Sequence, residues 1–71
     1  MKQMKKLSII LPTYNEKENV HKIYEAIKEV ITPLKLNYEI VYVDDNSPDG
    51  TIEIVKQLRE SDPNVKYILM S

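Results

Sequence analysis

Two polar segments carry the side chains that could do chemistry in this chain. Pro12 to Glu16 follows one apolar run, and Asp44 to Thr51 follows another. Each segment precedes a stretch with helical periodicity, so each is placed between a strand and a helix. Because the carboxyl ends of neighbouring parallel strands meet at one crevice, we expect these carboxylates, hydroxyls and the Tyr14 ring to form a single ligand site.

The adjacent acids Asp44 and Asp45 have three interpretations from their type and position. They can form a turn and cap the next helix, because aspartate accepts hydrogen bonds from nearby backbone donors. They can hold a divalent cation, or one of them can accept a hydrogen bond from an N–H of a nucleobase. Successive strand side chains alternate in direction, so we expect one acid to turn toward the loop and the other to face the crevice.

The segment Pro12 to Glu16 also has a structural and a ligand-binding interpretation. Asn15 is positioned to cap a helix, and Glu18 three residues later completes a capping-box pattern. Tyr14 lies outside the helical stripe, where its ring can lie against a base or a ribose. Glu16 would sit in the first helical turn, where the helix dipole favours a negative charge.

Hydrophobic periodicity predicts a β-α-β-α-β chain. Strands are expected over 7–11, 38–43 and 65–70, and helices from the Asn15 cap to Thr32 and over 51–60. Apolar positions at helical spacing are Val20, Ile23, Tyr24, Ile27, Val30, Ile31 and Leu34, followed in the second helix by Ile54, Val55 and Leu58.

This alternation predicts a three-stranded parallel sheet, and hence the α/β class, with strand order 3-2-1. Right-handed crossovers would then place both helices on one face and leave the other face bare and apolar. A flavodoxin-like order of 2-1-3 would instead put the helices on opposite faces. The bare face and the open first strand predict self-association, most simply as a homodimer.

Composition limits the chain to one small domain. The 71 residues are 42% hydrophobic and 30% charged, with 10 basic and 11 acidic side chains, so no nucleic-acid partner is indicated. There is no cysteine, which excludes a disulfide or a thiolate metal site. No apolar run approaches the roughly 20 residues of a membrane span, and we expect a cytoplasmic protein. The lone His21 is expected on the solvated face of its helix.

Two runs resemble the start of the family-2 glycosyltransferases. They are Ile9 to Glu16, followed by Asn19, and Tyr38 to Thr51. The ending Ser47 to Thr51, Ser-Pro-Asp-Gly-Thr, is similar to that of dolichol- and polyprenol-phosphate mannosyltransferases. The resemblance implies half of a Rossmann-like GT-A domain. It also implies an inverting enzyme that moves mannose from GDP-mannose to a polyprenyl phosphate.

The resemblance also implies roles for particular residues. Positions matching Pro12, Tyr14 and Glu16 cradle the nucleoside in the family. Asp45 matches the aspartate that recognises the base, and Val43 lines the pocket beside it. Asp44 either shares in binding or is structural. No residue of this chain matches a catalytic position.

The family also holds Mg²⁺ or Mn²⁺ through an Asp-x-Asp motif after a later strand, and this sequence has no such motif. We therefore expect residues 1–71 to be an incomplete, N-terminal nucleotide-binding part that does not turn over alone. In the parent enzyme it would be cytoplasmic and peripheral to the membrane. The alternatives are a non-catalytic nucleotide-binding or oligomerisation module, and a family-2 transferase that uses a UDP-sugar or a polysaccharide acceptor.

Overall fold

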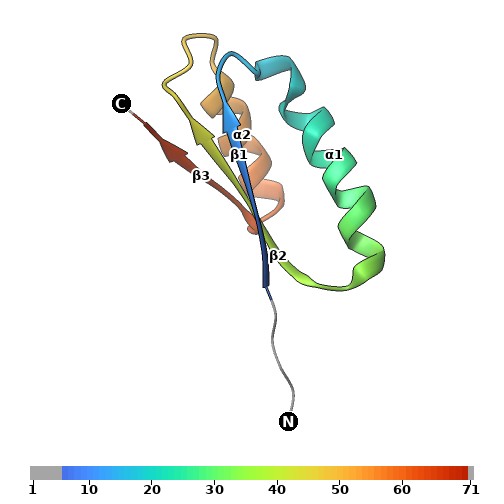
Figure 1. Cartoon of the computed structure of the whole chain (residues 1–71). Coiled ribbons are helices and arrows are strands. Elements are labelled where there is room, and N and C mark those ends of the chain that lie inside the picture. Colours follow the sequence, from blue (N-terminus) through green and yellow to red (C-terminus); the bar gives the residue numbers. More distant parts are fainter. Residues whose placement is uncertain (1–5, 71) are drawn as a thin grey trace.

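A computed structural model describes residues 6–70 as three strands separated by helices (Figure 1). In chain order the elements are β1 (Lys6–Thr13), the 3₁₀ turn η1 (Lys17–Asn19), α1 (Val20–Ile31), the 3₁₀ turn η2 (Thr32–Leu34), β2 (Asn37–Asp44), α2 (Thr51–Ser61) and β3 (Val65–Leu69). The alternation of strands and helices confirms the predicted α/β class.

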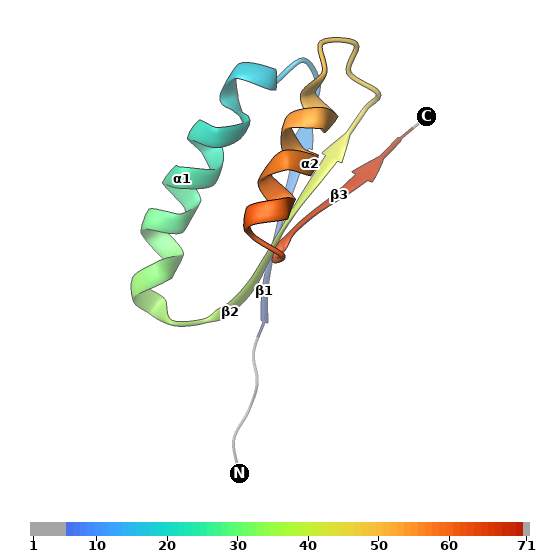
Figure 2. The ribbon, with the colours of Figure 1, turned by 180° about the vertical axis from the view of Figure 1, so that it is seen from behind.

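The three strands form one parallel sheet in the order β1-β2-β3, which is the predicted order 3-2-1. Ile40 of β2 is in register with Ile9 on one side and with Val65 on the other. Both crossovers step in the same direction, so α1 and α2 lie on the same face of the sheet (Figures 1 and 2). All three strands run toward the end where the β1–α1 and β2–α2 loops lie.

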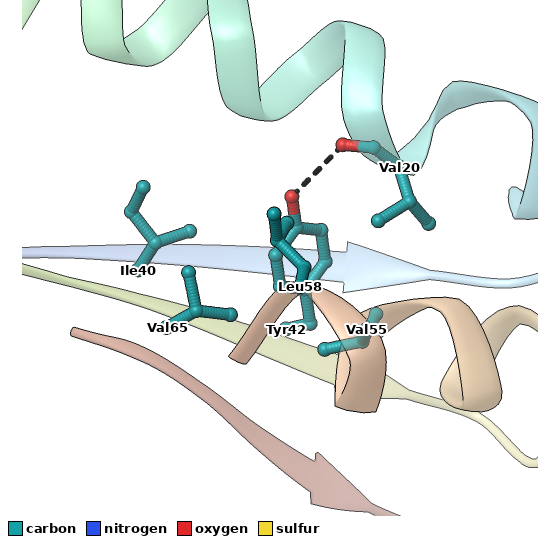
Figure 3. Packing of buried hydrophobic residues seen from close by; sticks show 6 residues of the cluster. All are labelled: Val20, Ile40, Tyr42, Val55, Leu58 and Val65. Atoms are coloured by element: carbon teal, nitrogen blue, oxygen red, sulfur yellow. Dashed lines mark hydrogen bonds between the residues drawn. The ribbon is translucent and has the colours of Figure 1, made fainter. Parts of the chain in front are cut away.

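The core lies between the two helices and the central strand, as Figure 3 shows. Its buried members are Val20, Ile40, Tyr42, Val55, Leu58 and Val65. Tyr42 is fully buried, and its hydroxyl donates to the carbonyl oxygen of Val20 at 3.1 Å (Figure 3). This bond satisfies the one polar group that the tyrosine brings into the apolar core. It also ties the start of α1 to the middle of β2.

The first strand is longer than predicted because it continues through Pro12 to Thr13. Among the described residues, β1 pairs only with β2, so it is an edge strand. An edge strand can accommodate proline, whose missing N–H is not required on the side without a partner. The extension matters for the site, since it brings Thr13 into register with Asp44.

The predicted helix cap at Asn15 is wrong. Asn15 adopts a left-handed backbone conformation with φ of 55°, and α1 begins only at Val20, after the η1 turn. Neither η1 nor α1 has a side-chain cap at its start, so the capping box with Glu18 is not formed. At the start of η1, side chains of the Ser47 to Thr51 segment accept from the backbone N–H groups of residues 15–17.

The ends of the helices follow the predicted signals more closely. α1 ends at Ile31, just before the Thr32-Pro33 pair, although the chain then makes the η2 turn instead of leaving the helix axis at once. Gly50, the only glycine of the chain, precedes α2 with φ of 88°, a left-handed conformation that glycine adopts without strain. None of the helices between residues 6 and 70 has the length and apolar character needed to cross a membrane.

The sheet face away from the helices is apolar at one end and charged at the other. Near the carboxyl ends of the strands, Ile10 and Ile68 are 57% and 52% exposed. Near the amino ends, Glu39 accepts hydrogen bonds from Lys66 Nζ (2.7 Å) and Ser8 Oγ (2.6 Å). These hydrogen bonds, of which the one from Lys66 has the largest effect, lower the pKa of Glu39 to about 2. The expectation of a wholly apolar face is therefore wrong at this end.

Candidate binding site at the carboxyl ends of the strands

The carboxyl ends of all three strands surround one open pocket of about 440 Å³. This volume lies in the range of roughly 300–1,000 Å³ that is usual for small-molecule sites. The pocket is lined by Pro12, Thr13, Tyr14, Val43, Asp45 and Met70. Four residues that the sequence singled out, Pro12, Tyr14, Val43 and Asp45, thus share one pocket.

Tyr14 and Asp45 reach the pocket from different loops that are joined by their backbones. The backbone N–H of Asp45 donates to the carbonyl oxygen of Thr13 at 3.1 Å, which extends the β1–β2 ladder past the last strand residue. The Tyr14 side chain is 54% exposed and that of Asp45 is exposed as well. An aromatic face and a carboxylate acceptor are therefore both accessible to a ligand in the same pocket.

Asp44 has a different environment from its neighbour. It is fully buried, and its carboxylate accepts hydrogen bonds from Thr13 Oγ1 (2.9 Å), Ser47 N (2.8 Å) and Ser47 Oγ (2.6 Å). Burial raises the pKa of Asp44, but the bonds from Ser47 and Thr13 outweigh burial, so its pKa lies below the usual value. As predicted from strand alternation, the two acids point apart, and Asp44 is the one that organises the turn.

Glu16 is placed outside this pocket. Its backbone N–H donates to Thr51 Oγ1 at 3.1 Å, and its Oε1 accepts from Asn19 Nδ2 at 2.9 Å. Its contacts fasten the first loop, whereas Pro12 and Tyr14 line the pocket. A role for Glu16 in cradling a nucleoside remains a prediction.

Sequence reasoning missed two residues of the pocket wall, Thr13 and Met70. Met70 follows β3, and its backbone N–H donates to the carbonyl oxygen of Asp44 at 2.8 Å. Met70 lies at the carboxyl end of a parallel strand, the position that predicts a shared site for Tyr14 and Asp45. Its apolar side chain carries no strong donor or acceptor, so its residue type alone does not indicate a binding role.

The carboxylates of this region do not fit a divalent cation. Asp49 already accepts from Thr51 N, Thr51 Oγ1 and Lys17 N, and Asp44 is enclosed by its own donors. Across residues 6–70, no group of three or more His, Cys, Asp or Glu side chains is arranged to hold a metal ion. A cation needs several oxygen ligands at once, and Asp45 supplies one carboxylate.

The fold and the pocket together define an α/β protein with an open pocket at the carboxyl ends of its parallel strands. Residues 8–71 match glycosyl transferase family 2, and the chain belongs to this family.

Three curated relatives illustrate the match. The chain is 44% identical over 61 residues to an uncharacterized glycosyltransferase, YkcC, of Bacillus subtilis, which covers 86% of the chain. It is 38% identical over 65 residues to the uncharacterized glycosyltransferase sll0501 of Synechocystis, covering 92%. It is 48% identical over 63 residues to a dolichol-phosphate mannosyltransferase of Pyrococcus furiosus, covering 89%. The chain spans 17–20% of the length of these three relatives.

Proposed function

We propose that the pocket binds the nucleoside of a nucleotide-sugar donor, and that the chain serves as the donor-binding part of an inverting glycosyltransferase. The observation that carries the proposal is that Tyr14 and Asp45, from loops after different strands, line one pocket. Membership of glycosyl transferase family 2 supports a sugar nucleotide as the ligand class.

The chemistry of the pocket wall matches a nucleoside in each of its parts. The ring of Tyr14 offers a flat surface for a base or a ribose. The Asp45 carboxylate only accepts hydrogen bonds, so it selects bases with ring N–H donors, such as guanine and uracil. The aliphatic surfaces of Pro12, Val43 and Met70 complete a pocket that combines apolar walls with one polar anchor.

We propose GDP-mannose as the donor and a polyprenyl phosphate as the acceptor. The supporting observation is the likeness to the dolichol-phosphate mannosyltransferase of Pyrococcus furiosus, together with the Ser47 to Thr51 ending. In this reaction an oxygen of the acceptor phosphate attacks the anomeric carbon of mannose. The bond between that carbon and the diphosphate breaks as the new bond forms, the configuration at the carbon is inverted, and GDP leaves with the bonding electrons.

A titration of the chain with GDP, UDP and AMP tests the proposal. We expect GDP to bind more tightly than AMP, because adenine offers no ring N–H to the Asp45 carboxylate. Asp45→Asn is expected to weaken GDP binding by roughly tenfold or more, as for the loss of a hydrogen bond to a charged group. Tyr14→Ala should weaken GDP and UDP alike.

Glu29→Gln is the matched control for Asp45→Asn, since it removes one exposed carboxylate from the side of α1. It should leave the affinity for GDP unchanged. Equal affinity of the wild type and Asp45→Asn for GDP would contradict the proposed site, as would equal binding of GDP and AMP.

A further inference from the structure

Three consecutive backbone N–H groups of the first loop are accepted by side chains of the second loop. Asn15 N donates to Ser47 Oγ at 2.9 Å and Glu16 N donates to Thr51 Oγ1 at 3.1 Å. Lys17 N donates to Asp49 Oδ2 at 3.2 Å. Each bond joins residues more than 30 positions apart in sequence, so the three bonds are tertiary contacts.

These N–H groups belong to the chain entering η1 and α1, where a helix leaves its first donors without partners inside the helix. In most helices a local side chain supplies the acceptor. Here η1 has no side-chain cap, and the N–H groups of residues 15–17 at its start are accepted by side chains of the Ser47 to Thr51 segment instead. The backbone donors of the first loop are therefore paired with side-chain acceptors of the second segment. If the two separated, both the donors and the acceptors would lose these hydrogen bonds.

Two of the three contacts continue as relays that end on a carboxylate. The hydroxyl of Ser47 accepts from Asn15 N and donates to Asp44 Oδ1. The hydroxyl of Thr51 accepts from Glu16 N and donates to Asp49 Oδ1. A hydroxyl that donates to a carboxylate has a fixed orientation and becomes a better acceptor, so each relay strengthens the bond to the loop amide.

The relays include residues that are adjacent in the chain to residues of the pocket. Asn15 follows Tyr14 in the chain, and Asp44 precedes Asp45. Asp44 also accepts a hydrogen bond from Thr13, which itself lines the pocket. Movement of the first loop away from Ser47 would therefore carry Tyr14 away from Asp45.

We propose that Ser47, Asp49 and Thr51 are positioning residues that hold the first loop against the end of β2 and so set the distance between Tyr14 and Asp45 in the pocket. The proposal deepens the proposed function and rests on it, since the pocket that is shaped is the nucleotide site. Ser47, Asp49 and Thr51 do not line this pocket. Their effect is therefore exerted through the backbone of residues 14–17.

Solvent-exchange rates of the backbone amides, measured by NMR on the full chain, test the positioning role without any ligand. In Ser47→Ala the amide of Asn15 should exchange roughly three- to tenfold faster, relative to the amides of β2, as for one lost hydrogen bond. The ring signals of Tyr14 should shift in the same variant. Ser47→Thr keeps the hydroxyl and should restore both values.

Ser61→Ala is the matched control, because among residues 6–70 the hydroxyl of Ser61 donates within α2, to the carbonyl oxygen of Leu58 at 3.0 Å. It should change neither the exchange rate of the Asn15 amide nor the ring signals of Tyr14.

Thr51→Val and Thr51→Ser form a second pair of variants, for which the exchange rate of the Glu16 amide is measured. Thr51 is fully buried, whereas Ser47 is only half-buried. If Thr51→Val does not fold, the Ser47 variants alone test the proposal. Wild-type exchange at Asn15 in Ser47→Ala, or unmoved Tyr14 ring signals, would overturn the proposal.

GDP and UDP titrations separate this proposal from the proposed function. Ser47→Ala should lower both affinities by a similar factor and speed exchange of the Asn15 amide, whereas Asp45→Asn should lower the affinities and leave that exchange rate unchanged. Unchanged affinities in Ser47→Ala would overturn the positioning role. If the wild type bound neither nucleotide, the proposed function would fail, and the exchange rates and Tyr14 signals would still decide whether Ser47 positions the loop.

Discussion

Asp44 and Asp45 are neighbours at the end of β2, yet the side chain of Asp44 is fully buried and that of Asp45 is exposed in the pocket. Alternation along the strand sends the two carboxylates to opposite sides. Asp44 fastens the two loops through Thr13 and Ser47. Asp45 is left accessible in the pocket, so Asp44 has a structural role and the binding role is proposed for Asp45.

The different environments of the two acids predict unequal losses of stability when each is replaced by asparagine. Asp44→Asn should lower the free energy of unfolding by about 1–3 kcal/mol, because an amide group cannot accept from all three donors that surround Asp44. Asp45→Asn should change it by less than about 0.5 kcal/mol. Urea denaturation measures both values. Equal losses in the two variants would contradict the structural role of Asp44.

Acid should destabilise the chain through carboxylates whose pKa is lowered in the fold. Burial raises the pKa of Asp62, but hydrogen bonds from the hydroxyls of Tyr24 and Tyr38 outweigh burial, and the pKa lies below its usual value. A lowered pKa gives stability that is fully present above the unfolded value of about 3.9. That stability is lost as the pH falls through the folded pKa.

Unfolding measured from pH 7 to pH 2 should therefore show a loss of stability that begins near pH 4. Asp62→Asn should be less stable at pH 7 and should show a smaller further loss on acidification. Glu29→Gln, which changes an exposed carboxylate, should follow the wild-type curve. An Asp62→Asn curve parallel to that of the wild type would rule out this source of acid sensitivity.

The core between α2 and the sheet should be sensitive to a small cavity. Val55 is fully buried in the cluster that contains Tyr42 and Val65. Val55→Ala should lower the free energy of unfolding by roughly 1–3 kcal/mol. Val30 on α1 is 67% exposed, and Val30→Ala should have an effect below about 0.5 kcal/mol. Similar losses in the two variants would show that the helices do not pack as described.

The uncovered sheet face leads us to propose that the chain associates with itself. Ile10 and Ile68 are both more than half exposed on this face. Light scattering over a dilution series should show association, and Ile10→Lys should weaken it. Leu34→Lys is the matched control, since Leu34 is 55% exposed and lies in η2, away from the sheet. A monomer at all concentrations, or equal effects of the two variants, would contradict this proposal.

Local patterns were sufficient to predict the three strands, the two main helices, the strand order and a shared site for Tyr14 and Asp45. Alternating apolar runs locate β2 and α2 to within a residue or so, and Thr32-Pro33 marks the end of α1. Tyr14 and Asp45 could be assigned to one site because parallel strands deliver their carboxyl ends to the same edge. These inferences depend only on residues close together in the chain and on a general rule of topology.

Contacts between the loops could not be predicted in the same way. Asn15 has the side chain of a helix cap, yet its backbone donates to Ser47, 32 residues away. Nothing in the local sequence specifies that the acceptors for the N–H groups at the start of η1 come from the Ser47 to Thr51 segment. The hydrogen bond from Ser8 to Glu39 depends likewise on the register that sets these two residues opposite each other. Such contacts become visible only when the strands are aligned.

A titration of ¹⁵N-labelled chain with GDP, followed by NMR at the backbone amides, tests the central claim most directly. The account predicts saturable shifts at Thr13, Tyr14, Asp45 and Met70, the residues of the pocket. A second pocket of about 450 Å³, lined by cations such as Lys56 and Arg59 beside Tyr67, could attract the diphosphate by charge alone. Shifts confined to that pocket, with the carboxyl ends of β1 and β2 unchanged, would contradict the account.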